Sequence, residues 1–316
     1  MIRYSPHNGG KMPGRKPPPL RKGDVIAIFA PAGPVDPKKL SRGIARLAAA
    51  GYVPEIADGV LAKERFLAGN DEHRAAQARW AFSLREARAV MAARGGYGTS
   101  RILPRIDWAS VARRPRIAVG YSDLSAILAY LSTRLGIPAI HGPMAAADLA
   151  RRPDPHALDA FFRLAAGTVS PKEPWGLPCD RLRGGAAEGR LAGGCLSVLT
   201  ALIGTPYEPD FRGALLFLED VAEPCYRIDR MLTQWIQSGR LSRIAGILAG
   251  RMSPVGGDTE EDIRTAFADA GSRVGVPVWY GFPAGHAERN YPLPFGVRAK
   301  VDSRGKLHLL ESPVAG

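Results

Sequence analysis

The sequence predicts an α/β fold, with an N-terminal open, mostly parallel α/β sandwich and a second, smaller β-rich α+β domain. Up to about residue 150, apolar runs of strand length alternate with segments of helical periodicity, which is typical of βαβ units. From about residue 180, short β-type runs become more frequent between the helices. The length of 316 residues suits more than one hydrophobic core.

The first βαβ unit begins with Asp24-Val-Ile-Ala-Ile-Phe-Ala, which reads as a buried strand. The helix expected over 37–50 closes at Gly51, and Tyr52-Val-Pro-Glu-Ile forms the next strand. The turn between the first strand and this helix lacks G-x-G-x-x-G, so a dinucleotide site is not indicated. The later elements of this half are expected as a helix from Asn70-Asp71, strands at 89–93, 117–119 and 137–141, and a helix from Leu124.

A change in composition marks the domain boundary. Residues 1–19 are rich in Pro, Gly, Lys and Arg and are predicted to form a disordered basic tail. We expect an α/β domain over 20–165, a proline-rich linker over 166–184 that includes a surface loop at Trp175, and a β-rich domain over 185–316. The second domain is expected to contain strands at 186–191, 214–219, 244–249, 276–280, 297–301 and 307–310, with helices at 195–203, 226–239 and 258–270.

Composition excludes several classes of protein. The net charge of +13 comes from arginines scattered along helices, and no zinc-finger, helix-turn-helix or RNP pattern accompanies it, so no nucleic-acid partner is predicted. No apolar run is long enough for a membrane span, and the N-terminus lacks a signal core. Three cysteines without metal-type spacing favour a reducing cytoplasm. We therefore predict a cytoplasmic protein with no membrane partner and no bound metal.

The most informative stretch is Gly120-Tyr121-Ser122-Asp123, which lies between an apolar strand and a helical pattern. A serine at such a turn faces the N-terminus of the next helix, where backbone N–H groups stabilise negative charge. This resembles a nucleophile elbow, although Leu124 replaces the second glycine of G-x-S-x-G. The alternative is that Ser122 only caps the helix.

A serine nucleophile needs a base and an orienting acid. Of six histidines, His286 is favoured by its glycine-flanked loop after a strand. Glu219 and Asp220 end a strongly apolar strand and are the candidate acids, although they could instead cap the next turn or pair with an arginine. Cys195 opens an apolar helix and is expected to pack in the core, not to act as the nucleophile. A non-catalytic small-ligand-binding module on the same scaffold is the remaining alternative.

Taken together, the motifs resemble the LD-carboxypeptidase family of serine peptidases, which includes the murein tetrapeptide carboxypeptidases and the microcin C immunity peptidases. The resemblance runs in order from about residue 20 to 298. It is carried by Gly23-Asp24, Phe66-Leu-Ala-Gly-Asn, Arg94-Gly-Gly-Tyr-Gly, Val119-Gly-Tyr-Ser-Asp, His141-Gly-Pro-Met, Leu191-Ala-Gly-Gly, Leu218-Glu-Asp-Val, Tyr226-Arg-Ile-Asp-Arg, and Gly285-His286 followed by Leu293-Pro294.

The resemblance implies a catalytic triad of Ser122, His286 and Glu219, with the serine in the first domain and the other two residues in the second. It further implies an oxyanion hole made by the backbone N–H of Asp123 and one N–H of the Gly95-Gly96 pair, with Gly96 preferred. No cofactor or metal is implied, and the expected assembly is a cytoplasmic homodimer.

The expected reaction is release of D-alanine from murein tetrapeptide during cell-wall recycling. The alternative is hydrolysis of a microcin C-type peptidyl-nucleotide, in which an aromatic residue near Trp175 would stack on the base. One departure is Cys195, which stands where the family usually has asparagine.

Overall fold

The structure is a computed structural model that describes residues 15–151, 153–287 and 289–316. Most of the predicted basic tail therefore lies outside the described residues. The part that is described packs against the C-terminal segment of the chain. Lys16 pairs with Glu311 at 2.9 Å, and the N–H of Ala315 donates to the carbonyl of Pro17 at 2.8 Å.

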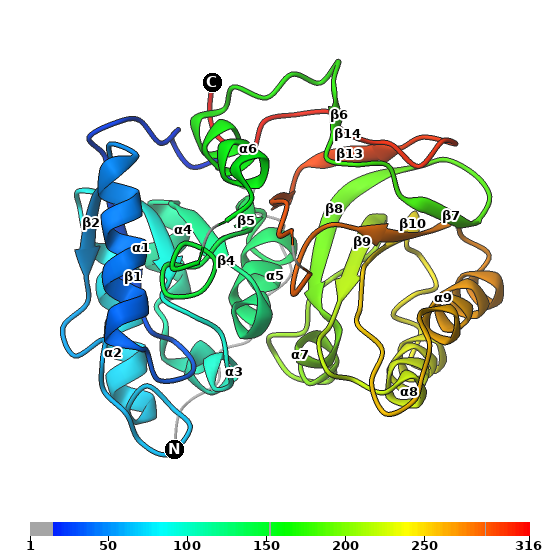
Figure 1. Ribbon diagram of the computed structural model, residues 1–316, viewed down its shortest axis with the longest axis horizontal. Helices are drawn as coiled ribbons and strands as arrows, with labels where there is room; N and C mark the ends of the chain where they lie inside the picture. The colour runs from blue at the N-terminus through cyan, green and yellow to red at the C-terminus, as the bar shows by residue number, and fades with distance from the viewer. Residues whose placement is uncertain (1–14, 152, 288) are drawn as a thin grey trace.

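The N-terminal half is built on a six-stranded sheet of the described residues (Figure 1). Its first five strands in the sequence are parallel, in the spatial order β5-β4-β3-β1-β2, so the order reverses between β1 and β3. Ligands bind such sheets at the carboxyl ends of strands next to this reversal. The strands are β1 (Val25–Phe29), β2 (Val53–Ile56), β3 (Ala87–Ala92), β4 (Ile117–Gly120) and β5 (Ala139–His141).

Local signals set the helices of this half. The carboxylate of Asp36 accepts from the N–H of Lys39 at the start of α1, and the side chain of Asn70 caps α2 in the same way. Both helices begin where the sequence places a capping residue. The helices are α1 (Pro37–Ala49), α2 (Asp71–Ser83), α3 (Thr99–Ile102), α4 (Trp108–Arg113), α5 (Ser125–Thr133) and α6 (Pro155–Ala166), with 3₁₀ turns at Leu103–Arg105 and Ser122–Leu124.

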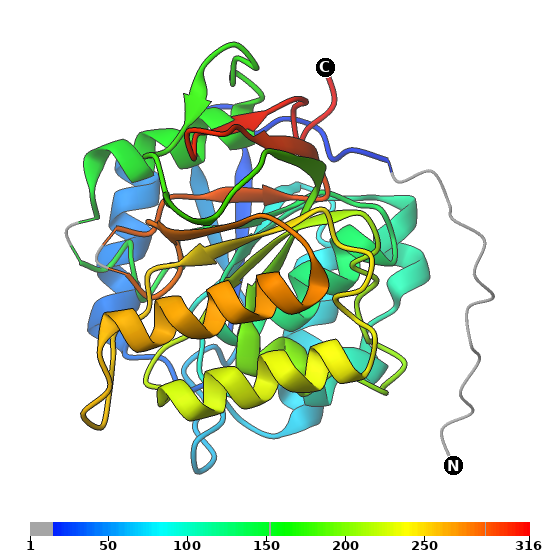
Figure 2. The ribbon, with the colours of Figure 1, turned by 90° about the vertical axis from the view of Figure 1, so that its right-hand side faces the viewer.

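The C-terminal half contains an eight-stranded sheet in the order β6-β14-β13-β8-β9-β10-β11-β7. Its centre, from β8 to β11, is parallel, and the flanking strands are antiparallel. The helices α8 and α9 lie side by side over one face of this sheet (Figure 2).

The elements of the second sheet and its helices are β6 (Pro174–Trp175), β7 (Asp180–Arg183), β8 (Ala187–Cys195), α7 (Leu196–Thr200), β9 (Ala214–Glu219), α8 (Cys225–Gln237), β10 (Gly246–Gly250), α9 (Glu260–Val274), β11 (Val278–Phe282), β13 (Arg298–Val301) and β14 (Leu307–Leu309). This mixed architecture, together with the parallel sheet of the first half, confirms the predicted fold class.

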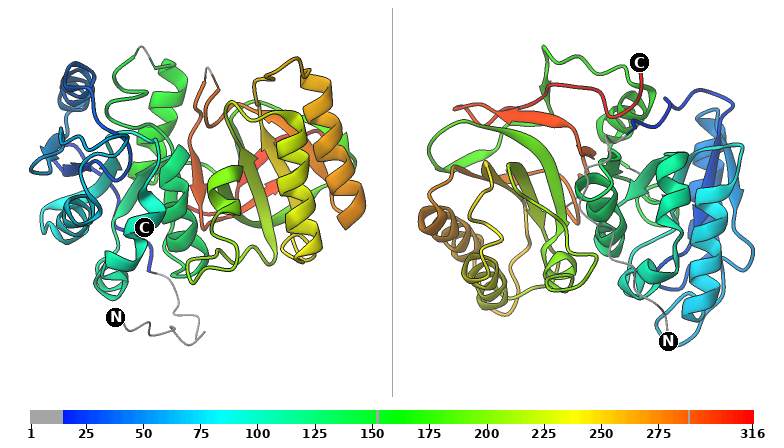
Figure 3. Two further views of the ribbon diagram at one scale, coloured as in Figure 1. Left: turned by 90° about the horizontal axis from the view of Figure 1, so that it is seen from below. Right: turned by 180° about the vertical axis from the view of Figure 1, so that it is seen from behind.

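The two halves share one continuous hydrophobic core. Helix α5 lies between the two sheets (Figure 3), and side chains such as Ile127, Phe217 and Phe282 belong to one buried cluster. Strand β12 (Leu293–Phe295) leaves the second half and pairs antiparallel with β5 in the first sheet. The chain segment around residue 286 is therefore anchored on both sides.

Trp175 differs from its prediction. The sequence suggested a surface loop, but Trp175 lies in β6 with only 3% of its surface exposed. Its indole N–H donates to the carbonyl of Pro292 at 2.8 Å, and its ring packs edge-on against Tyr291. Burying the large apolar ring of Trp175 stabilises the fold, and this outweighs the preference for a loop that the neighbouring prolines indicate. Within the described ranges, no helix combines the length and apolar character of a membrane span.

Candidate active site

Ser122 sits at the turn that joins β4 to α5. Its φ is 60°, in the left-handed region that residues with a Cβ adopt rarely and at an energetic cost. Gly120 precedes the turn, and a Cβ added there would lie 2.4 Å from Cδ2 of Leu124. The turn therefore depends on its first glycine, and Leu124 fills the space beside it. A strained serine between a strand and a helix is the backbone form of a nucleophile elbow.

His286 contacts both Ser122 and Glu219. The Oγ of Ser122 lies 3.1 Å from Nε2 of His286, and Nδ1 of His286 lies 2.7 Å from Oε2 of Glu219. A carboxylate beside Nδ1 favours the tautomer protonated at Nδ1, which leaves Nε2 free to accept the serine proton. The three side chains, separated by up to 164 positions in sequence, thus form one continuous hydrogen-bonded line.

Glu219 ends β9 and is fully buried. Its Oε2 also accepts from the backbone N–H of His286 at 3.1 Å, while Oε1 has no hydrogen-bond partner among the described residues. A Cβ added to Gly285 would lie 2.3 Å from Oε2, so only glycine leaves room for this carboxylate. A buried carboxylate is costly without a partner, and His286 supplies two donors.

The pKa of His286 is raised above its ordinary value. Burial is the largest single influence and acts to lower this pKa, but the hydrogen bond and charge of Glu219, together with the charges of Asp220 and Asp148, outweigh burial. The environment therefore favours the imidazolium that forms when the ring accepts a proton.

The glycine-rich turn after β3 lies directly against the serine. A Cβ on Gly95 would lie 2.7 Å from Oγ of Ser122 and 3.7 Å from the N atom of Asp123. The next residue, Gly96, approaches Gly33 of the turn after β1. A Cβ added to Gly96 would lie 2.9 Å from the Gly33 nitrogen. The turn after β3 therefore lies between the turn after β1, which it contacts through Gly33, and Ser122 after β4, at the carboxyl ends of the parallel strands.

The side chain of Asp123 has a structural task that the sequence did not reveal. Its carboxylate is buried and accepts from the N–H of Thr99 at 2.7 Å, at the start of α3. This bond ties the serine turn to the turn that contains Gly95 and Gly96. The backbone N–H of Asp123 remains the group of interest for an oxyanion.

Asp220, the other candidate acid, belongs to a different task. Its Oδ2 accepts from the N–H of Ser197 at 2.7 Å, beside the start of α7. Asp220 thus satisfies the start of α7, a helix that precedes it in the chain, and this differs from the expected capping of the turn that follows it. Cys195 lies next to Asp220, is buried, and has a thiol pKa raised well above its ordinary value, first by burial and then by the two neighbouring carboxylates. Such a thiol is a poor nucleophile.

His141 lies close to the site without contacting Ser122. It is fully buried among Tyr121, Phe217 and Phe295, and burial lowers its pKa to about 3. Its ring nitrogens have no hydrogen-bond partner in the described part of the chain. His141 is therefore a neutral packing residue beneath the site.

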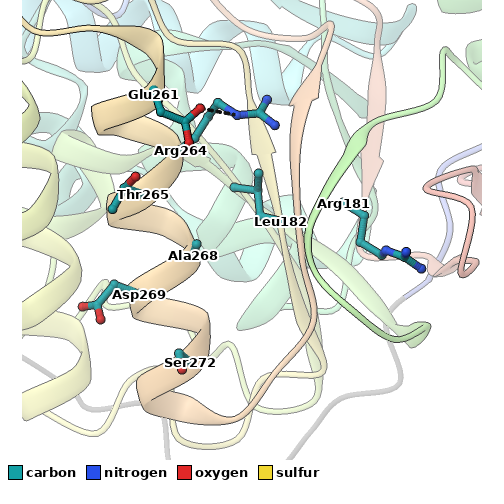
Figure 4. Close-up of a pocket in the computed structure, with 8 residues that line it drawn as sticks. All are labelled: Arg181, Leu182, Glu261, Arg264, Thr265, Ala268, Asp269 and Ser272. Carbon is teal, nitrogen blue, oxygen red and sulfur yellow. Dashed lines mark ion pairs between the residues drawn. The ribbon is translucent and has the colours of Figure 1, made fainter.

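A separate hollow lies between α9 and β7 (Figure 4). It measures about 410 Å³, and its lining includes Arg181, Arg264 and Glu261. Arg264 is already paired with Asp180 at 2.7 Å and with Glu261 at 3.3 Å. The hollow shares no lining residue with the Ser122 site and has none of its strain or buried charge.

Most of the chain matches known proteins of one family. Residues 26–142 match the model of the LD-carboxypeptidase N-terminal domain, and residues 188–301 match that of the LD-carboxypeptidase C-terminal domain. A Bacillus subtilis protein described as a probable murein peptide carboxypeptidase is 35% identical over 305 residues, which cover 95% of each chain.

Two solved structures extend this comparison. The crystal structure of a muramoyltetrapeptide carboxypeptidase from Oxalobacter formigenes is 33% identical, with a TM-score of 0.80 over 90% of this chain and 97% of that one. A structure of MccF in complex with glutamyl sulfamoyl guanosine is 21% identical, with a TM-score of 0.86 over 95% of this chain and 99% of that one. The second likeness concerns the fold alone.

Proposed function

This chain belongs to the LD-carboxypeptidase family, and we propose that it is a serine carboxypeptidase that releases the C-terminal D-alanine of murein tetrapeptide in cell-wall recycling. The observation that carries the proposal is the line from Ser122 through His286 to Glu219, with separations of 3.1 and 2.7 Å. The relatives named for murein peptides support the choice of substrate.

In the proposed reaction, Ser122 is the nucleophile, His286 the general base and Glu219 the acid that orients the imidazole. As Oγ attacks the carbonyl carbon before the D-residue, Nε2 of His286 takes the hydroxyl proton. The tetrahedral intermediate collapses when His286 gives that proton to the leaving amine, which departs as free D-alanine. Water then repeats the sequence on the acyl-enzyme and regenerates Ser122.

The oxyanion of each intermediate needs donors beside Ser122. We assign the backbone N–H groups of Asp123 and Gly96, as the family resemblance implies. The neighbouring Gly95 lies against Ser122, so the glycine turn approaches the serine with no side chain that would block it. In other enzymes, removing one such donor costs about 3 kcal/mol of transition-state stabilisation.

The alternative within the family is hydrolysis of a peptidyl-nucleotide, since the MccF structure holds a sulfamoyl guanosine ligand. Trp175 does not favour this alternative, because only 3% of its surface is exposed and its ring packs against Tyr291. A buried ring has no free face on which to stack a base.

One experiment separates these functions. The wild-type protein and Ser122→Ala are incubated with murein tetrapeptide and with an aminoacyl sulfamoyl nucleotide, and released D-alanine or nucleotide is measured. We expect D-alanine release by the wild-type protein alone, with labelling of Ser122 by a fluorophosphonate. A protein that cleaves only the nucleotide supports the alternative, and an unlabelled protein inactive on both supports a non-catalytic binding module.

We further propose that the protein works in the cytoplasm as a homodimer, as the family resemblance implies. The free state of all three cysteines in the structure supports a reducing compartment. Sedimentation of the full chain tests the dimer, and cell fractionation tests the location.

A further inference from the structure

The loop that carries His286 is tied to the half of the molecule that carries Ser122. We call residues 283–287 and 289–292 the His286 loop. The N–H of Gly285 donates to Oδ1 of Asn290 at 2.9 Å, within the loop. The Nδ2 group of Asn290 then donates to Oδ1 of Asp148 at 3.2 Å, which lies 142 positions earlier in the sequence.

Asp148 is itself fixed to the first half. Its Oδ2 accepts from the backbone N–H of Met144 at 3.0 Å, just after β5, which is the neighbour of β4 in the first sheet. Because β4 ends at the Ser122 turn, Asp148 and Ser122 are held on the same rigid support. A contact between the His286 loop and Asp148 therefore also holds this loop in a defined position relative to Ser122.

The two sides of His286 are thus anchored to different halves. Its own N–H donates to Glu219, on β9 of the second half, whereas the preceding N–H is linked through Asn290 to Asp148, on the first half. Tyr121, next to the serine, packs edge-on against the His286 ring with centroids 5.0 Å apart. Small displacements of a base from its nucleophile reduce rate strongly, by about 10²-fold for a shift of about 1 Å.

We propose that Asp148 and Asn290 are positioning residues, which hold His286 in register with Ser122 across the two halves of the protein. This inference rests on the proposed function for its effect on rate, but the contacts themselves do not depend on the identity of the substrate.

We call the hydrogen-bonded link from Gly285 through Asn290 to Asp148 the relay. The charge of Asp148 allows the relay to be tested independently of activity. The charges that raise the pKa of His286 are those of Glu219 and Asp220, from β9 and its following turn, and that of Asp148 from the first half. The rings of Tyr121, which packs on His286, and of the neutral His141 are the titratable groups beside it. Arg151 acts in turn on Asp148, whose own pKa is raised chiefly by burial. Removing the Asp148 charge removes one of the contributions that raise the pKa of His286.

The test uses the full-length protein with three variants. Asn290→Ala deletes both hydrogen bonds of the relay, and Asp148→Asn removes the charge at nearly constant size. Arg289→Ala is the matched control, because Arg289 lies in the same loop and pairs with Asp154 of the first half at 3.1 Å while its side chain is 55% exposed. Thermal unfolding is measured for each variant.

We expect Asn290→Ala to lower kcat by about 10- to 100-fold, as loss of other orienting contacts does, with little change in KM. Arg289→Ala should retain the wild-type kcat. In Asp148→Asn, the acid limb of the kcat/KM profile and the NMR titration of His286 should both move to lower pH.

The titration needs no substrate, so it separates this inference from the proposed function. If wild-type protein releases no D-alanine while Asp148→Asn still lowers the pH at which His286 titrates, the function is wrong and the electrostatic link from Asp148 to His286 across the two halves stands. An Asn290→Ala enzyme with wild-type kcat, or an Asp148→Asn protein whose His286 titrates as in the wild type, overturns the relay. Should Asn290→Ala not fold, the titration of Asp148→Asn decides alone.

Discussion

Ser122 and His286 are held in place in contrasting ways. The serine turn is fixed by its own neighbours in the sequence: a strand before it, a helix after it, and a glycine at position 120 whose space Leu124 occupies. The His286 loop lies between β11 and β12, but its position against Ser122 is set by residues distant in the sequence. It depends on Glu219 from β9 and on Asn290, which in turn contacts Asp148.

This difference indicates which substitutions should disturb the serine turn and which should disturb the His286 loop. A local turn is disturbed chiefly by changes inside it, whereas a loop held by distant partners is disturbed from many places. The predictions below test each part in turn, beginning with the largest expected effect.

Ser122→Ala should lower kcat by about 10⁴- to 10⁶-fold, the range found when the nucleophile of a comparable triad is removed. The matched control is Ser125→Ala, since Ser125 lies three residues further along the chain, is buried, and accepts from the N–H of Cys195 at 3.0 Å. D-Alanine release measures both. Equal losses in the two variants would show that Ser122 is structural.

Glu219→Gln should lower kcat by about 10³- to 10⁴-fold, because a neutral amide no longer favours the tautomer with its proton on Nδ1. Asp220→Asn is the control one residue further along, where the carboxylate accepts from Ser197. Steady-state kinetics on the two purified variants distinguishes them. A larger loss in the Asp220 variant would reassign the acid.

Gly285→Ala should lower kcat by about 10²-fold, because the new Cβ would lie 2.3 Å from Oε2 of Glu219 and must displace the His286 loop. Gly281→Ala provides a close control. Gly281 has a φ of 91°, compared with 90° for Gly285, but a Cβ there meets no atom within 4 Å. Both variants carry the same backbone strain, so only the clash separates their rates.

The acid limb of the kcat/KM profile should lie above pH 6.5, the ordinary value for histidine, because the net effect of burial and of the Glu219, Asp220 and Asp148 charges raises the pKa of His286. The base works only when neutral, so activity is lost as the pH falls through the raised pKa. The contribution to folding stability has the opposite sense: it is complete below about 6.5 and is lost as the pH rises through the folded-state pKa. A profile with its acid limb below the ordinary value would contradict this environment.

Arg264→Ala should have the smallest effect. It removes the ion pairs beside the hollow between α9 and β7, which we expect to change the free energy of unfolding by about 0–1 kcal/mol and kcat not at all. Chemical denaturation and D-alanine release measure the two quantities. A strong loss of activity would contradict the Ser122 site and indicate that the hollow between α9 and β7 takes part in the reaction.

Much of this organisation could be predicted from the chain alone. The helix expected over 37–50 is α1 (Pro37–Ala49), and the strand expected over 214–219 is β9. Both are strongly periodic or strongly apolar segments with clear start signals. The prediction for Trp175 failed because prolines and a glycine beside it indicate a loop, while the contact that buries it, with Tyr291, is more than 100 positions away.

For the site, the sequence supplied the candidates and the tertiary structure supplied their distances. Ser122 was recognisable because strand, turn and helix follow one another, and its residue types were matched by the family's ordered motifs. The capping role of Asp123 toward Thr99, the need for glycine at 285 and the link from Asn290 to Asp148 carry no signal of their own in a single sequence. Each joins groups that are remote in the chain or depends on the space around one atom.

The sequence by itself therefore determined the fold class and the strand–turn–helix around Ser122, because these follow from periodicity and from residue types close together in the chain. The choice of His286 and Glu219 as partners of the serine came from the resemblance to the family's ordered motifs. Only the tertiary structure decided that Nε2 of His286 lies 3.1 Å from Ser122 and that Glu219 meets its other nitrogen. The physical reason is that these contacts depend on how two sheets pack around α5, and a packing distance is a property of the assembled core.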